Sequence, residues 1–364
     1  MSHATQDVDR AGGPEGVASA TAPPSPSPSP REQILLAHGG GGQLTDELLA
    51  KSVLPRLGNR VLNEFLDSGI VSHKGDAIAT TIDSYVVRPL RFPGGDIGRL
   101  AVCGTVNDLA VCGAEPAGLA LSLIIEEGFD RHELEEILDS VARTAAEAGV
   151  RVVTGDTKVV GRGQADGLFI TTAGVGSVRA DSQLHPGHVR AGDVLIINGP
   201  IADHGLAVMI AREMAGMRTV IRSDVAPLNK MISWLLDKVP GTAFMRDPTR
   251  GGLAGVVVDL AARTRLHVVI DEAAVPVRPE TRHAAEMLGL DPLEVANEGK
   301  VVIVVRPEDA EAALRALRED EHGREAQVIG WVEPTTDGIC EVRTAIGGRR
   351  ILQKPYGEQL PRIC

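Results

Sequence analysis

Four aspartates stand at strand ends or in glycine-rich turns, and their side chains are candidates for binding a metal–nucleotide complex. They are Asp83 in TTIDSYVV, Asp108 in GTVNDLAVCGAEP, Asp156 in VTGDTKVV and Asp247 in MRDPTRGGLAG. Each is flanked by apolar or small residues, where an unpaired charge is costly to bury. Mg²⁺ prefers oxygen ligands and leaves coordination positions for substrate phosphates, so Mg-nucleotide would account for all four. The alternative is that they cap helices and form turns, as Asp commonly does.

Three further segments are candidates for contacting phosphate. Lys158 follows Asp156 by two residues, so both side chains lie on one side of an extended segment. In RDPTRGGLAG, Arg250 brings a charge, and Gly251–Gly252 opens a predicted helix whose N-terminus favours anions. An ordinary loop-to-helix junction is the alternative there. HGGGGQLTDELL offers unencumbered backbone N–H groups before a helix but lacks the Lys-Ser/Thr of a P-loop.

The last residue of the chain is a cysteine, in QLPRIC. Terminal residues are loosely ordered unless something holds them, so a cysteine in this position most often has no structural or functional role. From about Leu352 to Cys364, an extended chain reaches on the order of 40 Å at ~3.3 Å per residue. The other cysteines have no activating setting: Cys103 falls on a predicted core stripe of a helix, and Cys112 and Cys340 show no flanking base.

Composition excludes several classes of protein. The chain has 364 residues, a formal net charge of -12 and 2% aromatic residues, so it lacks the basic and stacking side chains of nucleic-acid binders. It has no apolar run of about 18 residues and no signal-peptide pattern at its start. Four cysteines without C-x-x-C spacing favour a reduced, cytoplasmic protein over a disulfide framework or zinc site. We therefore expect no nucleic acid and no membrane as partners.

Strands and helices alternate along the chain, which predicts two α/β units in series. Residues 1–31, rich in Ala, Gly, Pro and Ser, are predicted to be disordered. The turn-rich stretch 179–193 separates a predicted N-terminal domain (32–180) from a C-terminal domain (188–345), and residues 346–364 are expected to form a mobile tail. The predicted strands are 77–83, 117–128, 151–160, 167–178, 194–200, 266–273 and 300–305, and the predicted helices are 97–114, 130–150, 202–216, 251–264 and 308–319.

The motifs taken in order resemble a known family. HGGGGQLT, TTIDSYVV, GTVNDLAVCGAEP, TGDTKVV, RDPTRGGLA, NEGK and the terminal PRIC resemble the HypE family of hydrogenase-maturation carbamoyl dehydratases, from about residue 33 to 364. The middle motifs alone indicate the wider superfamily of aminoimidazole ribonucleotide (AIR) synthetase, selenophosphate synthetase and thiamine monophosphate kinase, and PRIC narrows it. The resemblance implies a two-domain α/β ATP-binding fold like that of AIR synthetase. It also implies a homodimer whose N-terminal domains pair through their sheets, with ATP and Mg²⁺ in the cleft between domains.

The resemblance further implies a reaction. A partner carbamoyltransferase, HypF, loads a carbamoyl group onto Cys364, and ATP drives its dehydration to a thiocyanate. This supplies the cyanide ligands of NiFe hydrogenase iron through the HypC–HypD scaffold. Glu298 in VANEGK is then the candidate base and Lys158 the group that holds the phosphorylated oxygen, whereas a lone Glu in such a place is otherwise a solvated turn residue. The alternatives are a small-molecule kinase or synthetase of the superfamily and a non-catalytic nucleotide-binding scaffold.

The site residues that the resemblance implies fall into three sets. The catalytic residues are Cys364, Lys158 and Glu298. The nucleotide-binding residues are Asp83, Asn107, Asp108, Gly155, Asp156, Arg250, Gly251 and Gly252. The metal ligands are Asp83, Asp108, Asp156 and Asp247.

Overall fold

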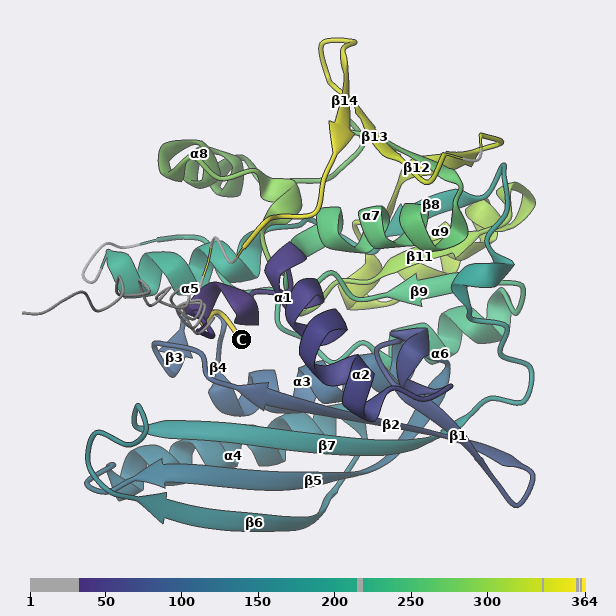
Figure 1. Ribbon diagram of the computed structural model, residues 1–364. Helices are drawn as coiled ribbons and strands as arrows, with labels where there is room; N and C mark the ends of the chain where they lie inside the picture. Colours follow the sequence, from purple (N-terminus) through teal and green to yellow (C-terminus); the bar gives the residue numbers. More distant parts are fainter. Residues whose placement is uncertain (1–32, 215–218, 336, 358–359, 361) are drawn as a thin grey trace, which may run out of the picture. The chain divides into compact units, whose positions relative to one another are not determined.

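Two large β-sheets organise the chain in the computed structural model (Figure 1). The structure describes residues 33–214, 219–335, 337–357, 360 and 362–364. The predicted disordered segment, residues 1–31, lies outside the described residues. Leu35–Cys364 forms one compact unit, and one apolar cluster continues from the first sheet into the second.

The first sheet has five strands in the order β1-β2-β7-β5-β6, antiparallel except for the parallel pair β5 and β6. Its strands are β1 (Gly69–His73), β2 (Asp76–Tyr85), β5 (Ala114–Glu126), β6 (Val152–Val160) and β7 (Leu168–Val178). A short ribbon, β3 (Arg91–Phe92) and β4 (Gly95–Asp96), precedes its first long helix. Before the sheet, α1 (Gln43–Leu48) and α2 (Leu54–Leu57) flank a π-helical turn (Leu49–Val53).

Helices α3 (Ile97–Val111) and α4 (Arg131–Ala148) cover one face of this sheet. Each begins at an aspartate whose side chain accepts backbone N–H bonds of the first turn: Asp96 for α3 and Asp130 for α4. Helix α3 is buried almost all round, because the sheet, α4 and the second half of the chain all pack against it. It therefore carries its polar residues Asn107 and Asp108 into the junction between the two halves.

The second sheet has seven strands in the order β14-β13-β10-β12-β8-β11-β9, antiparallel except for β10 and β13. Its strands are β8 (Val194–Ile197), β9 (Phe244–Arg246), β10 (His267–Asp271), β11 (Val302–Val305), β12 (Gln327–Glu333), β13 (Cys340–Arg343) and β14 (Arg349–Leu352). Its helices are α5 (Asp203–Glu213), α6 (Asn229–Lys238), α7 (Gly252–Thr264), α8 (Pro279–Leu288) and α9 (Ala310–Arg318). The described helices include none long and apolar enough to cross a membrane.

The start of the predicted tail needs correction. The sequence places it at residue 346, but Arg349–Leu352 forms β14 and pairs with β13, with Leu352 opposite Cys340. The local sequence shows only a short polar segment there, because the pairing partner supplies the strand. The tail therefore begins after Leu352, and the changeover between the sheets falls between Val178 and Val194.

Candidate functional site

A polar cavity of about 240 Å³ brings the C-terminal cysteine together with several carboxylates. It lies where β2 and α3 meet the loop after β9 and the segment before β11. Its functional lining residues are Asp67, Thr81, Asp83, Tyr85, Asp108, Asp247, Thr249, Arg250, Glu298 and Cys364. Five acids thus surround one thiol, and four of these acids and the thiol are residues that the sequence singles out.

Burial of these carboxylates makes the cavity electrostatically unusual. The pKa values of Asp108, Asp247 and Glu298 are all raised well above the ordinary range, first by burial and then by neighbouring carboxylates. A Thr81 hydroxyl donates to Asp108 at 2.7 Å, and the Tyr85 hydroxyl donates to Asp83 at 3.3 Å. A bound cation would offset the repulsion between these carboxylates and allow them to ionise, so the cavity favours cation binding.

Asp67 belongs to this cavity and is absent from the sequence-based set. It follows a 3-10 helix, and its carboxylate lies 3.0 Å from Arg246 of β9. Burial raises its pKa, and Arg246 opposes that rise. Its segment, EFLDSG, carries no signal that separates it from any other turn, so only the fold reveals its place.

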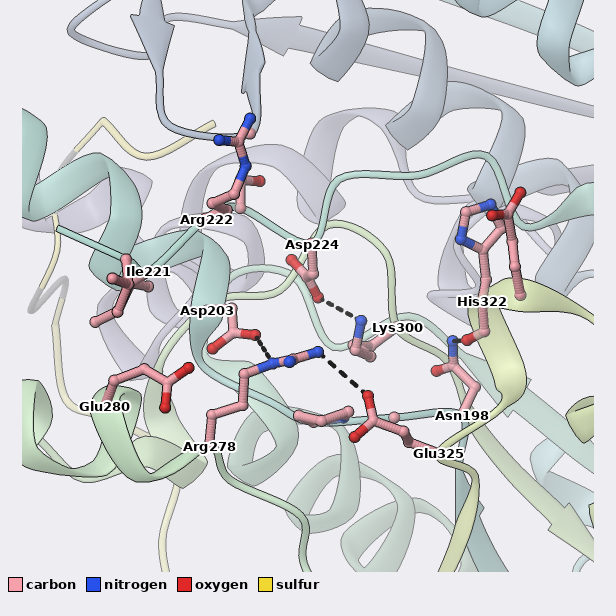
Figure 2. A pocket seen from close by; sticks show the side chains of 16 residues that line it. Asn198, Asp203, Ile221, Arg222, Asp224, Arg278, Glu280, Lys300, His322 and Glu325 are labelled. Carbon is pink, nitrogen blue, oxygen red and sulfur yellow. Dashed lines mark hydrogen bonds and ion pairs between the residues drawn. The ribbon is translucent and has the colours of Figure 1, made fainter.

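A second polar cavity, of about 430 Å³, is lined by Asp224 and Lys300, whose ion pair is visible in Figure 2. The backbone N–H of Glu298 donates to Asp224 at 3.1 Å, and Lys300 lies 3.0 Å from the other Asp224 oxygen. Burial opposes ionisation of Asp224, but the Lys300 ammonium holds its pKa below the ordinary value. Asp224 therefore remains a fixed acceptor that orients the Glu298 backbone.

The C-terminal segment is docked, and its partner is the chain just after β2. Val86 N–H donates to an oxygen of the Cys364 carboxylate at 3.1 Å, and Arg88 N–H donates to the Arg362 carbonyl at 3.2 Å. The Arg362 guanidinium also lies 2.6 Å from Asp166. These contacts hold the end of the chain against the segment after β2, which places Cys364 at the cavity.

Asp156 lies away from this cavity within one chain. It pairs with Ser122 of β5, which pairs with Thr171 of β7, which in turn is opposite Ser84 of β2. Paired residues share a sheet face and sequence neighbours alternate, so Asp156 shares a face with Ser84 whereas Asp83 points to the opposite face. Three strand spacings separate the two aspartates, about 14 Å.

Lys158 and Gly155 accompany Asp156 on the edge strand β6. Lys158 and Asp156 form an ion pair at 2.7 Å, with 66% and 60% of their side chains exposed. A Cβ at Gly155 would meet the Leu121 carbonyl at 2.3 Å, so this glycine permits close strand pairing. Asp156, Lys158 and Gly155 therefore lie apart from the acidic cavity of their own chain. Spacing along a strand does not reveal which sheet face its side chains occupy.

Asn107 and Gly252, two other residues predicted to contact nucleotide, both have contacts within the protein. The Asn107 amide donates to the Ala226 carbonyl at 3.0 Å and accepts from Leu228 N–H at 2.8 Å, so it joins α3 to the second half of the chain. Its contact with nucleotide stays a prediction. Gly252 has φ +60, and a Cβ there would meet the Leu293 carbonyl at 2.6 Å. That glycine sets the close start of α7.

A larger cavity, about 630 Å³, adjoins the acidic one. The two share the lining residues Asp67, Asp247, Thr249 and Arg250. The larger one has an apolar part formed by Leu49, Leu54, Phe65 and Val256, and a cationic part formed by Arg246, Arg263 and Lys354. Its Arg250 guanidinium donates to the Gly39 carbonyl at 2.9 Å, which brings the HGGGGQLT segment against the RDPTRGG segment.

Comparison with known proteins identifies the family. The profiles "AIR synthase related protein, N-terminal domain" and "AIR synthase related protein, C-terminal domain" match residues 66–178 and 190–343. Carbamoyl dehydratase HypE of Rhodobacter capsulatus is 45% identical over 336 residues, which are 92% of this chain and 98% of the relative. This chain belongs to the HypE family of carbamoyl dehydratases. The sequence predictions of the AIR-synthase-like fold and of an ATP-dependent carbamoyl dehydratase of hydrogenase maturation are thereby confirmed.

Solved structures of HypE agree with this assignment. A chain of the HypE–HypF complex is 41% identical, with a TM-score of 0.80, over 85% of this chain and 99% of that one. HypE in complex with ATP is 41% identical, with a TM-score of 0.76, over 91% of this chain and 100% of that one.

Proposed function

We propose that this chain uses Mg-ATP to dehydrate a carbamoyl group on Cys364 to a thiocyanate, which supplies cyanide ligands to the iron of a NiFe hydrogenase. The supporting observation is that Cys364, at the end of the chain, lines the same cavity as Asp83, Asp108, Asp247 and Glu298. A small-molecule kinase and a nucleotide-binding scaffold both leave a terminal thiol in that cavity unexplained.

The chemistry accounts for the acids beside the thiol. Amide oxygen is a poor leaving group, so the carbamoyl oxygen attacks the γ-phosphorus of ATP and ADP departs, while one N–H proton is removed. Loss of the second nitrogen proton then breaks the C–O bond, and phosphate leaves as S–C≡N forms. Glu298, whose pKa burial raises well above the ordinary value, is the base that we assign to the nitrogen.

Mg²⁺ fits the carboxylates of this cavity. Among the described residues, no group of three or more acidic, His or Cys side chains is close enough to hold one ion. Mg²⁺ usually takes one or two carboxylates and completes its shell with phosphate and water, so one or two carboxylates from among Asp83, Asp108 and Asp247 would be a sufficient donor set. Bound Mg²⁺ would neutralise phosphate charge during transfer.

The nucleotide is proposed to occupy the larger cavity. Its apolar part suits a base, its cations suit phosphates, and the lining residues shared with the acidic cavity include Arg250 and Asp247. This arrangement points the γ-phosphate toward Cys364. The solved complex of a HypE with ATP supports the choice of nucleotide.

The tail must also leave this site to be loaded and unloaded. We propose HypF as the carbamoyltransferase that loads Cys364, in keeping with the solved HypE–HypF complex, and the HypC–HypD scaffold as the acceptor. Residues 353–364, the part after β14, form the tether. The four cysteines form no disulfide with one another, which suits a reducing compartment, and we place the protein in the cytoplasm.

A homodimer would cover an open apolar sheet face and bring in the missing residues. Ile82, Ile124 and Val175 lie on the face opposite α3, with 68%, 37% and 43% exposed. A second copy offers the same apolar surface, which suits an isologous interface. Asp156 and Lys158 lie on this face, so we propose that each copy delivers them to its partner's acidic cavity.

Mixing two inactive variants tests this delivery. Lys158→Ala and Glu298→Gln are each expected to be nearly inactive alone, but a re-equilibrated equal mixture should recover about a quarter of wild-type turnover, since half the dimers hold one intact site. Thiocyanate formation is measured after mixing. Mixing Glu298→Gln with Asp247→Asn is the matched control. Both residues serve the cavity of their own chain, so a mixed dimer holds no intact site and this mixture should stay inactive. No recovery in the first mixture would contradict delivery by the partner.

Metal removal tests the proposed reaction. The chain is incubated with HypF, a carbamoyl donor and Mg-ATP, and the C≡N stretch of a thiocyanate is followed by infrared absorption. We expect the band to vanish when the Mg²⁺ is chelated before ATP is added, and to return when Mg²⁺ is restored in excess. A band of equal intensity without Mg²⁺ or without ATP would contradict the proposal.

A further inference from the structure

The carbonyl group before the Cα atom of Cys364 and the carboxylate after it are both held by hydrogen bonds. The ring Nε2 of His204 lies 2.7 Å from the Ile363 carbonyl, and Val86 N–H donates to an oxygen of the Cys364 carboxylate at 3.1 Å. A peptide unit is planar, so fixing the Ile363 carbonyl fixes the orientation of the peptide that leads into Cys364. With both groups held, the backbone of Cys364 is fixed, and its χ1 rotamer sets the direction of the thiol.

His204 is itself held in one orientation. It is fully buried in the first turn of α5, its Nδ1 lies 2.8 Å from the Ser223 hydroxyl, and its ring meets Phe92 edge-on at 5.4 Å. Burial lowers the pKa of His204 and favours the neutral ring. A carbonyl only accepts hydrogen bonds, so Nε2 carries the proton and Nδ1 accepts from Ser223.

The neighbouring tail contacts complete the register. Arg362 donates through Nε to the Val86 carbonyl at 2.9 Å and through Nη1 to Asp166 at 2.6 Å. The Ile363 side chain is 4% exposed and packs in the apolar cluster that also contains Leu360. These contacts dock the tail, but only the His204 contact acts on the peptide directly before the reacting residue.

We propose that His204 is a positioning residue for the dehydration: through the Ile363 carbonyl it sets the direction in which the Cys364 group enters the acidic cavity. The inference rests on the proposed function and deepens it. His204 touches neither substrate nor the reacting atoms. Its contribution is orientation, and a misplacement of about 1 Å at a reacting centre costs on the order of 100-fold in rate.

The test compares His204→Phe, which keeps a ring against Phe92 but removes both ring nitrogens, with the wild-type chain. Each is loaded with HypF and a carbamoyl donor, and a single turnover with Mg-ATP is followed by the mass of the C-terminal peptide. We expect His204→Phe to lose water about 10- to 100-fold more slowly, with loading and the Kd for ATP within about twofold of wild type. We also expect its Cys364 to be alkylated faster, because the tail leaves its site more readily.

Three further variants make the result decisive. His204→Gln retains a donor near the Nε2 position and should recover most of the rate. Ser223→Ala removes the group that orients the ring without touching the tail, and it should slow water loss by a smaller factor. His267→Phe, at a mostly buried histidine of β10 that pairs with Asp337, is the matched control and should leave all readouts unchanged.

Each outcome decides the proposal. Wild-type single-turnover rates in His204→Phe, or an equal loss of loading, ATP binding and dehydration, would overturn it. Should His204→Phe fail to fold, Ser223→Ala decides: slower water loss with faster alkylation supports positioning, and wild-type behaviour overturns it. A wild-type chain that loads but never loses water refutes the proposed function instead, while the alkylation rates still report whether His204 holds the tail.

Discussion

Replacing Cys364 with alanine is expected to abolish thiocyanate formation completely while folding and ATP binding remain intact. The thiol is the proposed attachment point of the carbamoyl group, and no neighbouring group can substitute for it. The side chain is half-buried at the end of the chain, so its removal leaves the sheets and the acidic cavity unchanged. The measurement is the thiocyanate infrared band together with the Kd for ATP.

Cys340→Ala provides the matched control for this change. Cys340 is buried in β13, and burial raises its pKa to about 12, so it is a poor nucleophile. Burial likewise raises the pKa values of Cys103 and Cys112. We expect Cys340→Ala to form thiocyanate at a wild-type rate at a temperature where it is folded. Thiocyanate formation by Cys364→Ala would contradict the assignment of the reacting thiol.

Replacing Glu298 with glutamine is expected to lower the dehydration rate by about 10²- to 10⁴-fold, the usual contribution of a general base. Carbamoyl loading and ATP binding should be retained, so carbamoylated Cys364 accumulates. The wild-type rate should rise with pH through the raised pKa of Glu298, because only the ionised carboxylate accepts a proton. The pH profile of single-turnover water loss in both proteins measures this.

The same change should stabilise the chain when no Mg-ATP is present. The pKa of folded Glu298 lies above its unfolded value, so between the two values the folded chain binds more protons, and stability falls as the pH rises through that interval. At neutral pH, Glu298→Gln removes that cost and should raise Tm by on the order of 2 °C. Glu280→Gln is the control. Glu280 is exposed at the 430 Å³ cavity that Asp224 and Lys300 line, and this change should alter neither the dehydration rate nor Tm. A Glu298→Gln chain with wild-type rates would exclude Glu298 as the base.

Local sequence patterns were sufficient to predict several of the helices and strands that position the site. The apolar alternation of β2 and the acidic opening of α4 predicted those elements within a few residues. The strand β14 and helices α6 and α8 were not predicted. Helices α6 and α8 are amphipathic, so their sequences do carry a helical signal. Strand β14 is a short polar segment that its pairing with β13 stabilises.

Much of the acidic cavity could likewise be predicted, because Asp83, Asp108, Asp247, Glu298 and Cys364 each fall in a recognisable motif. The residues that sequence reasoning missed act through distant contacts. Asp67 reaches the cavity through its ion pair with Arg246, 179 positions away, and His204 holds the carbonyl of a residue 159 positions away. Contacts between residues so far apart in the chain cannot be predicted from the spacing of neighbouring residues.

The sequence also could not predict which face of the sheet the side chains of β6 occupy. Asp156 and Lys158 have the types and spacing of a phosphate-binding pair, and their ion pair confirms that they lie on one side of β6. Which side that is depends on the order of strands in the sheet, which spacing does not encode. Their place in the reaction therefore depends on the proposed homodimer.

The measurement that tests the central claim most directly is the intact mass of the C-terminal peptide after incubation with HypF and a carbamoyl donor, with and without Mg-ATP. The account predicts a carbamoyl adduct on Cys364 that persists without Mg-ATP and loses one water when Mg-ATP is added. An unmodified Cys364 thiol in a chain that still binds or hydrolyses ATP would contradict it.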